Sequence, residues 1–166
     1  MRVATRGRAA SRIGARFVGV GMITAVALGL AAGPASAQPG PPSDAGVQPV
    51  EVAGNPTFAS LDPEVWGTFN CQGQPIRIED PEEGDTSGPI TITNIDANNT
   101  FDFEVDEDFA VIGVIVKGGP NANVYDYRPT GIQADENLHA PINPNNGQFY
   151  GLSHIDFCVV PDGNNT

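Results

Sequence analysis

The chain contains few basic residues: 8 Lys and Arg stand against 20 Asp and Glu among its 166 residues. Five of the eight are arginines close to the N-terminus, namely Arg2, Arg6, Arg8, Arg12 and Arg16. Proteins that bind nucleic acids or anionic lipid surfaces need basic patches to neutralise phosphates. The composition therefore excludes a nucleic-acid partner, and cations are the charged partners that it favours.

Long apolar runs are absent after residue 37. Residues 17–32 are apolar, and the small residues Ala35-Ser36-Ala37 follow, an order typical of an export leader with its cleavage site. We therefore predict a signal peptide at residues 1–37, and the alternative is an uncleaved N-terminal anchor. Cleavage would leave three basic residues against twenty acids, a formal charge of −17. The mature protein is then expected outside the cell or associated with the cell wall, without membrane insertion.

Amphipathic helical periodicity is also absent. Residues 101–106 (FDFEVD) alternate between apolar and acidic, which is typical of a half-buried strand. Residues 110–117 (AVIGVIVK) are apolar on both faces, which predicts a central strand covered on both sides. Further strands are expected at 65–71, 76–78, 90–95 and 152–159. The pattern predicts an all-β domain, a β-sandwich of about seven strands that is immunoglobulin-like or related.

The mature chain is long enough for one domain with its own core. Residues 38–56 hold five prolines, three glycines and no aromatic residue, a composition that predicts a disordered linker. We expect the β-sandwich domain at residues 57–160. The polar residues 161–166 are expected to form a flexible tail.

Only two cysteines occur, Cys71 and Cys158, and both lie in the exported part. A disulfide that ties the first strand to the last is expected, and a free, reactive pair is the alternative. In residues 152–159 the alternation places Cys158 on the face of His154 and Asp156, opposite the apolar residues. The expected bridge therefore requires either a β-bulge or a position at a sheet edge.

The two histidines, His139 and His154, give weak support for catalysis. His154 and Asp156 are two residues apart on a strand, a spacing that suits two metal ligands or a base with its orienting carboxylate, with His139 as a third ligand. No nucleophile elbow and no HExxH pattern accompanies them. We therefore expect that the protein is not an enzyme and that its histidines are structural. A metal-assisted hydrolase is a distant alternative.

The acids Asp102, Glu104 and Asp106 lie on one face of an expected strand, about 6–7 Å apart. Their spacing resembles the start of a calcium loop, but position six is Glu107 and position twelve is Gly113, so it is not an EF-hand. We interpret them as a solvated face. The alternative is a bound cation, Ca²⁺ being the only cofactor that the sequence suggests.

Two segments could form a ligand-binding surface if the fold brings them together: GGPNANVYDY at 118–127 and HAPINPNNGQFYG at 139–151. The first segment, 118–127, can also be explained by the turn preferences of Gly, Pro and Asn alone. Residues 128–148 show no periodicity, and connections of this length in compact domains are often functional. Aromatic rings flanked by amides suit neutral sugars, and the candidate binding residues are Asn121, Asn123, Tyr125, Tyr127, Asn143, Asn145 and Tyr150. If Val124 points outward, the first two of these tyrosines belong to the core instead.

The motifs VIVKGGPNANVYDY and HAPINPNNGQFYGLSHIDFC resemble a family of secreted bacterial domains that occur alone or as modules of larger surface proteins. The resemblance covers about residues 111–158. It implies export, a β architecture and the bridge between Cys71 and Cys158, but no catalytic residue, because the family's function is unsettled. We expect a module that binds envelope polysaccharide or a surface protein, and the alternative is a passive structural domain of the envelope or matrix. The Asn-Asn-Thr triplets at Asn98 and Asn164 are glycosylation acceptors only in a suitable host.

Overall fold

The computed structural model describes residues 40–163. The predicted signal peptide, the first two residues of the predicted linker and Asn164 lie outside the described residues. Within the described part there are nine strands and one short helix: β1 (Val50–Ala53), α1 (Pro63–Trp66), β2 (Ile76–Glu79), β3 (Thr86–Ser87), β4 (Ile90–Ile95), β5 (Thr100–Val105), β6 (Phe109–Gly118), β7 (Asn121–Asp126), β8 (Ala134–His139) and β9 (His154–Pro161). No helix among residues 40–163 is long and apolar enough to cross a membrane.

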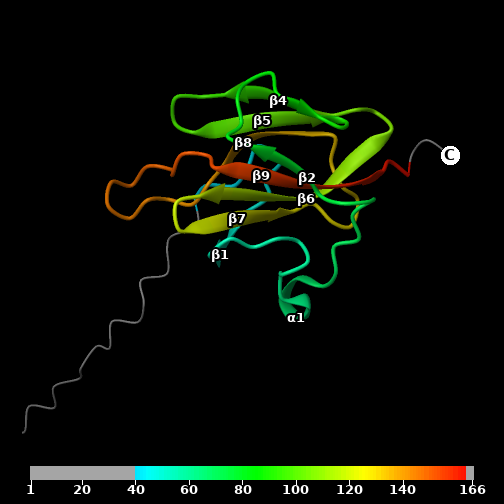
Figure 1. The fold of residues 1–166 in the computed structure, drawn as a ribbon, viewed down its shortest axis with the longest axis horizontal. Helices are drawn as coiled ribbons and strands as arrows, with labels where there is room; N and C mark the ends of the chain where they lie inside the picture. The colour runs from blue at the N-terminus through cyan, green and yellow to red at the C-terminus, as the bar shows by residue number, and fades with distance from the viewer. Residues whose placement is uncertain (1–39, 164–166) are drawn as a thin grey trace, which may run out of the picture. The chain divides into compact units, whose positions relative to one another are not determined.

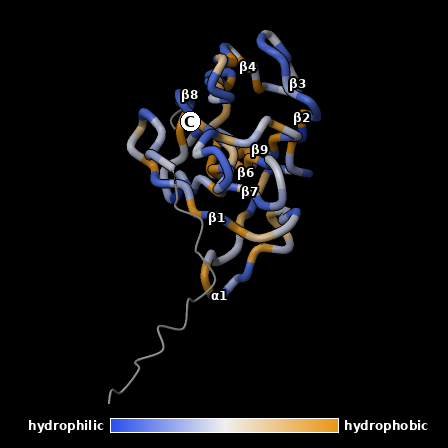
Figure 2. The backbone as a smooth tube through the Cα atoms, turned by 90° about the vertical axis from the view of Figure 1, so that its left-hand side faces the viewer, coloured by the Kyte–Doolittle hydropathy of each residue, from blue (hydrophilic) through white to orange (hydrophobic). Residues whose placement is uncertain are grey.

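The strands form two antiparallel sheets, so the all-β prediction is confirmed. The five-stranded sheet has the order β1-β7-β6-β9-β2, and the four-stranded sheet has the order β3-β4-β5-β8 (Figure 1). The sheets pack face to face through alternate residues of their strands, as the period of two predicts. The rings of Phe103 and Phe157 meet across this interface with their centroids 5.2 Å apart. Figure 2 shows hydrophobic segments gathered around β6 and β9 inside the fold.

Strand β6 is buried on both faces, as predicted from residues 110–117. It lies in the middle of the five-stranded sheet, between β7 and β9. Val114 and Val116 belong to the core between the two sheets, whereas Ile115 belongs to a second apolar cluster on the opposite face. The second cluster exists because another part of the chain covers that face.

The covering segment, residues 57–73, lies over the outer face of the five-stranded sheet. Its side chains Phe58, Leu61 and Phe69 pack on that face and are themselves buried. A Cβ on Gly113 would lie 2.5 Å from the ring of Phe69, so only glycine permits this close packing. The strand predicted at residues 65–71 is therefore wrong: this stretch forms the end of α1 and an irregular loop.

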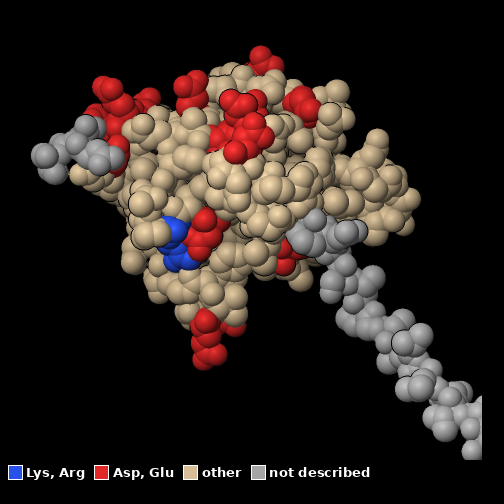
Figure 3. Space-filling view, turned by 180° about the vertical axis from the view of Figure 1, so that it is seen from behind, with Lys and Arg blue, Asp and Glu red and all other residues tan. Residues whose placement is uncertain are grey.

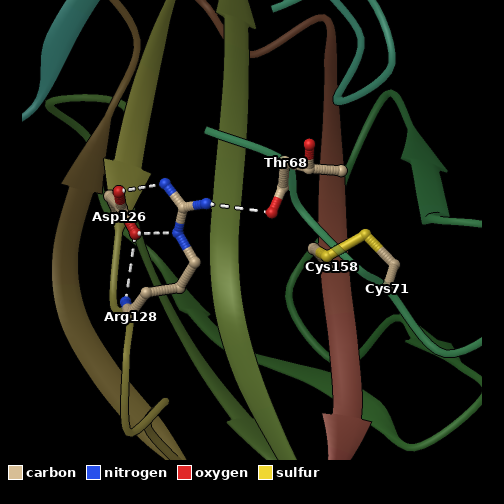
Figure 4. Close-up of a disulfide and its surroundings, with 5 residues drawn as sticks. All are labelled: Thr68, Cys71, Asp126, Arg128 and Cys158. Atoms are coloured by element: carbon tan, nitrogen blue, oxygen red, sulfur yellow. Dashed lines mark hydrogen bonds and ion pairs between the residues drawn. A yellow bond between two sulfur atoms is a disulfide. The ribbon is translucent and has the colours of Figure 1, made fainter. Parts of the chain in front are cut away.

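Arg128 anchors the covering segment to the sheet. Its guanidinium lies 3.6 Å from the centroid of the Phe69 ring, and its Nη1 donates to the carbonyl oxygen of Thr68 at 3.2 Å. Its Nε donates to Asp126 Oδ1 at 2.8 Å, which orients the side chain (Figure 4). The arginine thus combines a cation–π contact with charge-assisted hydrogen bonds.

The disulfide between Cys71 and Cys158 is present, with the two Cα atoms 4.9 Å apart (Figure 4). Cys158 is fully buried in the cluster beneath the covering segment. We expected a bulge or a sheet edge, and β9 is not an edge strand. A bulge does lie beside the cysteine, between Val111 and Gly113 of the neighbouring β6. It does not change the alternation in β9: Cys158 stays on the face opposite Phe157 and Val159, and a second layer covers that face. The bridge joins the covering segment, rather than a first strand, to β9.

The prediction of a disordered linker is wrong for the described residues 40–56. Strand β1 pairs with β7 in the five-stranded sheet. Residues 40–48, here named the strap, lie along β8: the amide of Asp44 donates to the carbonyl oxygen of Glu136 at 3.0 Å, and the amide of Ala45 donates to Asp135 Oδ1 at 2.8 Å. Proline and glycine form ordered turns here because the free edges of β7 and β8 offer hydrogen-bond partners.

The long patternless connection expected at residues 128–148 contains strand β8. Its pairing with β5 shifts between Phe101 and Phe103, and Asn137 within it has a φ of 61°. A bulge with a left-handed residue interrupts the alternation of side chains. This irregularity explains why the sequence pattern does not reveal the strand.

Candidate functional site

Two of the predicted binding tyrosines belong to the core. Tyr125 and Tyr127 have exposed fractions of 0% and 6%, respectively. The hydroxyl of Tyr125 accepts from the His139 amide at 2.9 Å, and the hydroxyl of Tyr127 donates to Asp135 Oδ2 at 2.6 Å. Burial raises the pKa of both hydroxyls. Val124 lies on the outer face under the covering segment, so the predicted patch of exposed rings does not form.

Asn121 and Asn123 lie in strand β7 rather than in a loop. The connection between β6 and β7 is only Gly119-Pro120, with Gly119 at a φ of 59°, as two-residue hairpins require. Asn123 is 1% exposed, and its Nδ2 donates to the carbonyl oxygen of His139 at 3.0 Å. Asn121 forms side-chain hydrogen bonds at the end of β1, with Glu51 and with the amide of Gly54. Both asparagines hold strands together.

The remaining predicted binding residues lie in the connection between β8 and β9. Asn143 and Asn145 shape its tip, where Asn143 Oδ1 accepts from the Asn145 amide at 3.0 Å. Tyr150 is half-buried against the hairpin, since a Cβ on Gly119 would lie 2.6 Å from its ring. The two segments are therefore neighbours, but packing against Gly119 occupies the tyrosine.

The three acids of the expected cation site have different environments. Asp102 connects β5 to both of its neighbours: Oδ2 accepts from Asn94 Nδ2 at 2.9 Å, and Oδ1 accepts from the Asn137 amide at 2.8 Å. Glu104 and Asp106 are exposed. Among the described residues there is no group of three or more His, Cys, Asp or Glu that could hold a metal ion. Calcium binding stays an untested alternative to the interpretation as a solvated face.

The histidines do not come together. Asp156 is paired with Arg77, whose Nε and Nη2 lie 2.6 and 2.7 Å from its two oxygens. His154 is next to Glu79, at 3.7 Å, and burial, followed by the charge of Arg77, lowers its pKa. His139 belongs to the other sheet. The predicted set of His139, His154 and Asp156 is therefore not a shared site.

A cavity of about 520 Å³ lies elsewhere, between the strap, the turn after β4, the end of β8 and the connection before β9. We name it the strap cavity. Its size is within the range of about 300–1,000 Å³ for small-molecule pockets. Amide side chains, two carboxylates, prolines and one phenylalanine line it: Pro41, Pro42, Asp44, Asp96, Ala97, Asn98, Asn99, Thr100, Asn137, His139, Gly147, Gln148 and Phe149.

The turn between β4 and β5 forms one wall of the strap cavity. Asp96 accepts from the amides of Asn98 and Thr100 at 2.8 and 2.9 Å, and from Asn98 Nδ2 at 2.9 Å. These hydrogen bonds lower the pKa of Asp96, so the carboxylate stays ionised. The bond from the Thr100 amide has the largest effect. Asn99 has a φ of 64°, a conformation that asparagine tolerates. The turn is thus held by its own side chains.

The strap forms another wall of the strap cavity. Asp44 Oδ1 accepts from Asn137 Nδ2 at 2.8 Å, and the carbonyl oxygen of Pro41 accepts from His139 Nε2 at 3.0 Å. A Cβ on Gly40 would lie 2.1 Å from the His139 ring, so glycine is required where the strap crosses the histidine. His139 therefore fixes the position of this wall.

A pair of aromatic rings, His139 and Phe149, lines the strap cavity. The rings of His139 and Phe149 are stacked, with their centroids 3.9 Å apart and their planes at 13°. His139 is fully buried, whereas Phe149 is half-buried and lines the cavity. Since His139 covers one face of Phe149, the accessible part of the phenylalanine is its other face or its edge. The cavity thus combines an apolar ring with amide donors and acceptors.

The residues that line the strap cavity were largely missed by sequence reasoning. Turn residues such as Asn98 and Asn99 are visible in the sequence, but their meeting with Phe149 and the strap depends on the arrangement of the sheets. Comparison with protein-family models, curated proteins and solved structures finds no match to this chain. Membership of the family of secreted surface domains stays a prediction.

Proposed function

We propose that this protein is a secreted, non-enzymatic module that binds carbohydrate in the strap cavity, at or near the cell surface. One observation carries the proposal: the cavity of about 520 Å³ combines the side chains of Asn98, Asn99, Asn137 and Gln148 with the ring of Phe149. The glycan-binding role expected from the sequence is thereby assigned to a different set of residues.

The chemistry of the strap cavity suits a polyhydroxyl ligand. Asparagine and glutamine side chains each offer two N–H donors and a carbonyl acceptor, which satisfy hydroxyl groups without the desolvation of a charge. The C–H face of a sugar ring is apolar and packs on an aromatic ring such as Phe149. A cavity walled by the strap and by a self-supported turn is also pre-formed, which lowers the entropic cost of binding.

Two features support export and the absence of a reaction. The disulfide is typical of proteins in oxidising compartments, which agrees with a signal peptide at residues 1–37. No reaction is included in the proposal, because Asp156 is engaged by Arg77 and the two histidines lie in different sheets. A passive structural domain is the alternative if the strap cavity binds no ligand.

The test is retention of the secreted protein on insoluble polysaccharides, measured by co-sedimentation with variants of the strap cavity. Phe149→Leu keeps an apolar side chain over His139 but removes the ring, and Gln148→Ala removes one amide from the rim. We expect both to weaken retention while far-ultraviolet circular dichroism stays unchanged.

Gln74→Ala is the matched control, because Gln74 is exposed and lies outside the strap cavity. It should bind as the unchanged protein does. If no polysaccharide retains the protein, or if all three variants are retained equally, the carbohydrate proposal is wrong and the passive domain replaces it.

A further inference from the structure

The strap cavity contains two carboxylates that come from distant parts of the chain. Asp44 belongs to the strap, and Asp96 belongs to the turn between β4 and β5. None of the residues that line the cavity is a Lys or an Arg. The cavity therefore has a negative charge that its own lining does not neutralise.

Basic side chains elsewhere in residues 40–163 are engaged away from the strap cavity. Arg77 is paired with Asp156, and Arg128 is paired with Asp126. Lys117 donates to backbone carbonyl oxygens at the hairpin after β6. These are all three basic residues of that part of the chain, against twenty acids. Figure 3 shows Asp and Glu spread over one face of the molecule.

The two carboxylates differ in what they offer to a ligand. The oxygens of Asp96 already accept three hydrogen bonds, all of them from its own turn. Asp44 accepts one hydrogen bond at Oδ1, from Asn137, and no described residue donates to its Oδ2. Asp44 thus presents a charged acceptor at the wall of the strap cavity, and Asp96 adds a second negative charge to its lining.

We propose that the carbohydrate bound in the strap cavity carries a protonated amino group, as glucosamine polymers do, and that Asp44 binds this group. The inference rests on the proposed function, because it names the class of carbohydrate. An ammonium group supplies three N–H donors, which suit the open Oδ2 of Asp44. The same sugar ring lies with its C–H face against Phe149.

The negative charge of the strap cavity favours an amino sugar over acidic or neutral sugars. A uronic acid or a phosphorylated sugar would bring a negative charge next to Asp44 and Asp96, and like charges at close distance are unfavourable. An N-acetylated sugar retains its shape but lacks the charge. Asp44 is exposed, so we expect a preference of about threefold to fivefold for the amine. Salt screens exposed charges, so the preference decreases with ionic strength.

The experiment compares three soluble oligosaccharides of equal length by isothermal titration calorimetry: oligomers of glucosamine, of N-acetylglucosamine and of glucose. The full secreted protein is used at low and at high salt. We expect the glucosamine oligomer to bind about threefold to fivefold more tightly than the other two at low salt, with a smaller difference at high salt.

Two variants locate the effect. Asp44→Asn keeps the shape of the side chain and should reduce the preference to about twofold or less. Glu83→Gln removes the same charge from an exposed residue outside the strap cavity and should leave the preference unchanged. Spermine serves as a cation without a sugar ring and should bind at least about tenfold more weakly than the glucosamine oligomer, because Phe149 and the amides contribute nothing to it.

The outcomes separate this inference from the proposed function. Equal affinity for the three oligosaccharides overturns the role of the amino group but leaves carbohydrate binding intact. Equal effects of Asp44→Asn and Glu83→Gln, or spermine binding as tight as that of the glucosamine oligomer, reduce the effect to general electrostatics and overturn the inference. The absence of binding by all three oligosaccharides, together with no retention on polysaccharides, overturns the proposed function as well.

Discussion

His139 and Phe149 stack face to face, with their ring centroids 3.9 Å apart. The histidine is the last residue of β8, and the phenylalanine belongs to the connection before β9. Because His139 Nε2 also donates to the carbonyl oxygen of Pro41, one imidazole supports both Phe149 in the cavity lining and the wall that the strap forms. The stability of the strap and the shape of the cavity are therefore coupled.

Gly40→Ala tests this coupling. A Cβ at this position would lie 2.1 Å from the ring of His139, so the strap must move away from β8. We expect a loss of about 1–3 kcal/mol in the free energy of unfolding, measured by urea denaturation, together with weaker polysaccharide retention. Gly151→Ala is the control, because a Cβ there meets no atom within 4 Å. Similar stability of the two variants would contradict the role of the strap.

Asp102→Asn tests the connection between β4, β5 and β8. Each oxygen of Asp102 accepts a hydrogen bond from a neighbouring strand, and an amide replaces one acceptor by a donor that faces another donor. We expect a loss of about 1–3 kcal/mol in the free energy of unfolding. Glu104→Gln on the same strand is exposed and should change it by less than about 0.5 kcal/mol.

Added calcium tests whether Asp102, Glu104 and Asp106 form a solvated face or a cation site. If the acidic face is only solvated, millimolar calcium should leave the melting temperature unchanged relative to EDTA. An increase that disappears when both Glu104 and Asp106 are neutralised would support a cation site instead.

Arg77→Met leaves the carboxylate of Asp156 without its partner. The side chain of Asp156 is 4% exposed, and both of its oxygens accept from Arg77. An unpaired buried charge is costly, so we expect the free energy of unfolding to fall by about 3 kcal/mol. The double variant Arg77→Met with Asp156→Leu should recover most of this loss. A single variant as stable as the unchanged protein would show that water replaces the guanidinium.

The stability of the fold should depend on pH through His154. Burial is the main cause that lowers its pKa below the ordinary value of about 6.5. The unfolded chain therefore takes up the proton at a higher pH than the folded protein does. The contribution of the neutral imidazole is complete above about pH 6.5 and is lost as the pH falls through the lower folded pKa.

The measurement for His154 is urea denaturation between pH 7.5 and pH 5, compared with His154→Gln. Because the many carboxylates also titrate toward the acid end of this range, only the difference between the two proteins reports on the histidine. We expect the variant to lose less stability on acidification. Identical pH profiles would show that His154 protonates equally in both states.

Local pattern was enough to predict five of the strands. The segments predicted as strands at 76–78, 90–95, 101–106, 110–117 and 152–159 correspond to β2, β4, β5, β6 and β9, because alternation and a continuous apolar run are properties of the segment itself. The disulfide was also predictable, since only two cysteines are available. In contrast, the bulge at Asn137 hides β8 in the sequence pattern, and residues 65–71 of the covering segment were predicted as a strand that does not form. The position of the covering segment depends on its packing against residues far away in the sequence.

The sequence by itself determined that this protein is an acidic all-β domain with one disulfide, because composition, alternation and the cysteine count do not depend on long-range contacts. Only the tertiary structure decided which face of each strand is buried. Val124 lies under the covering segment, so Tyr125 and Tyr127 turn into the core between the sheets. The strap cavity likewise exists only because β4, β8 and residues 40–48 meet at one end of the fold, and such a meeting is set by strand order and register, which no single segment encodes.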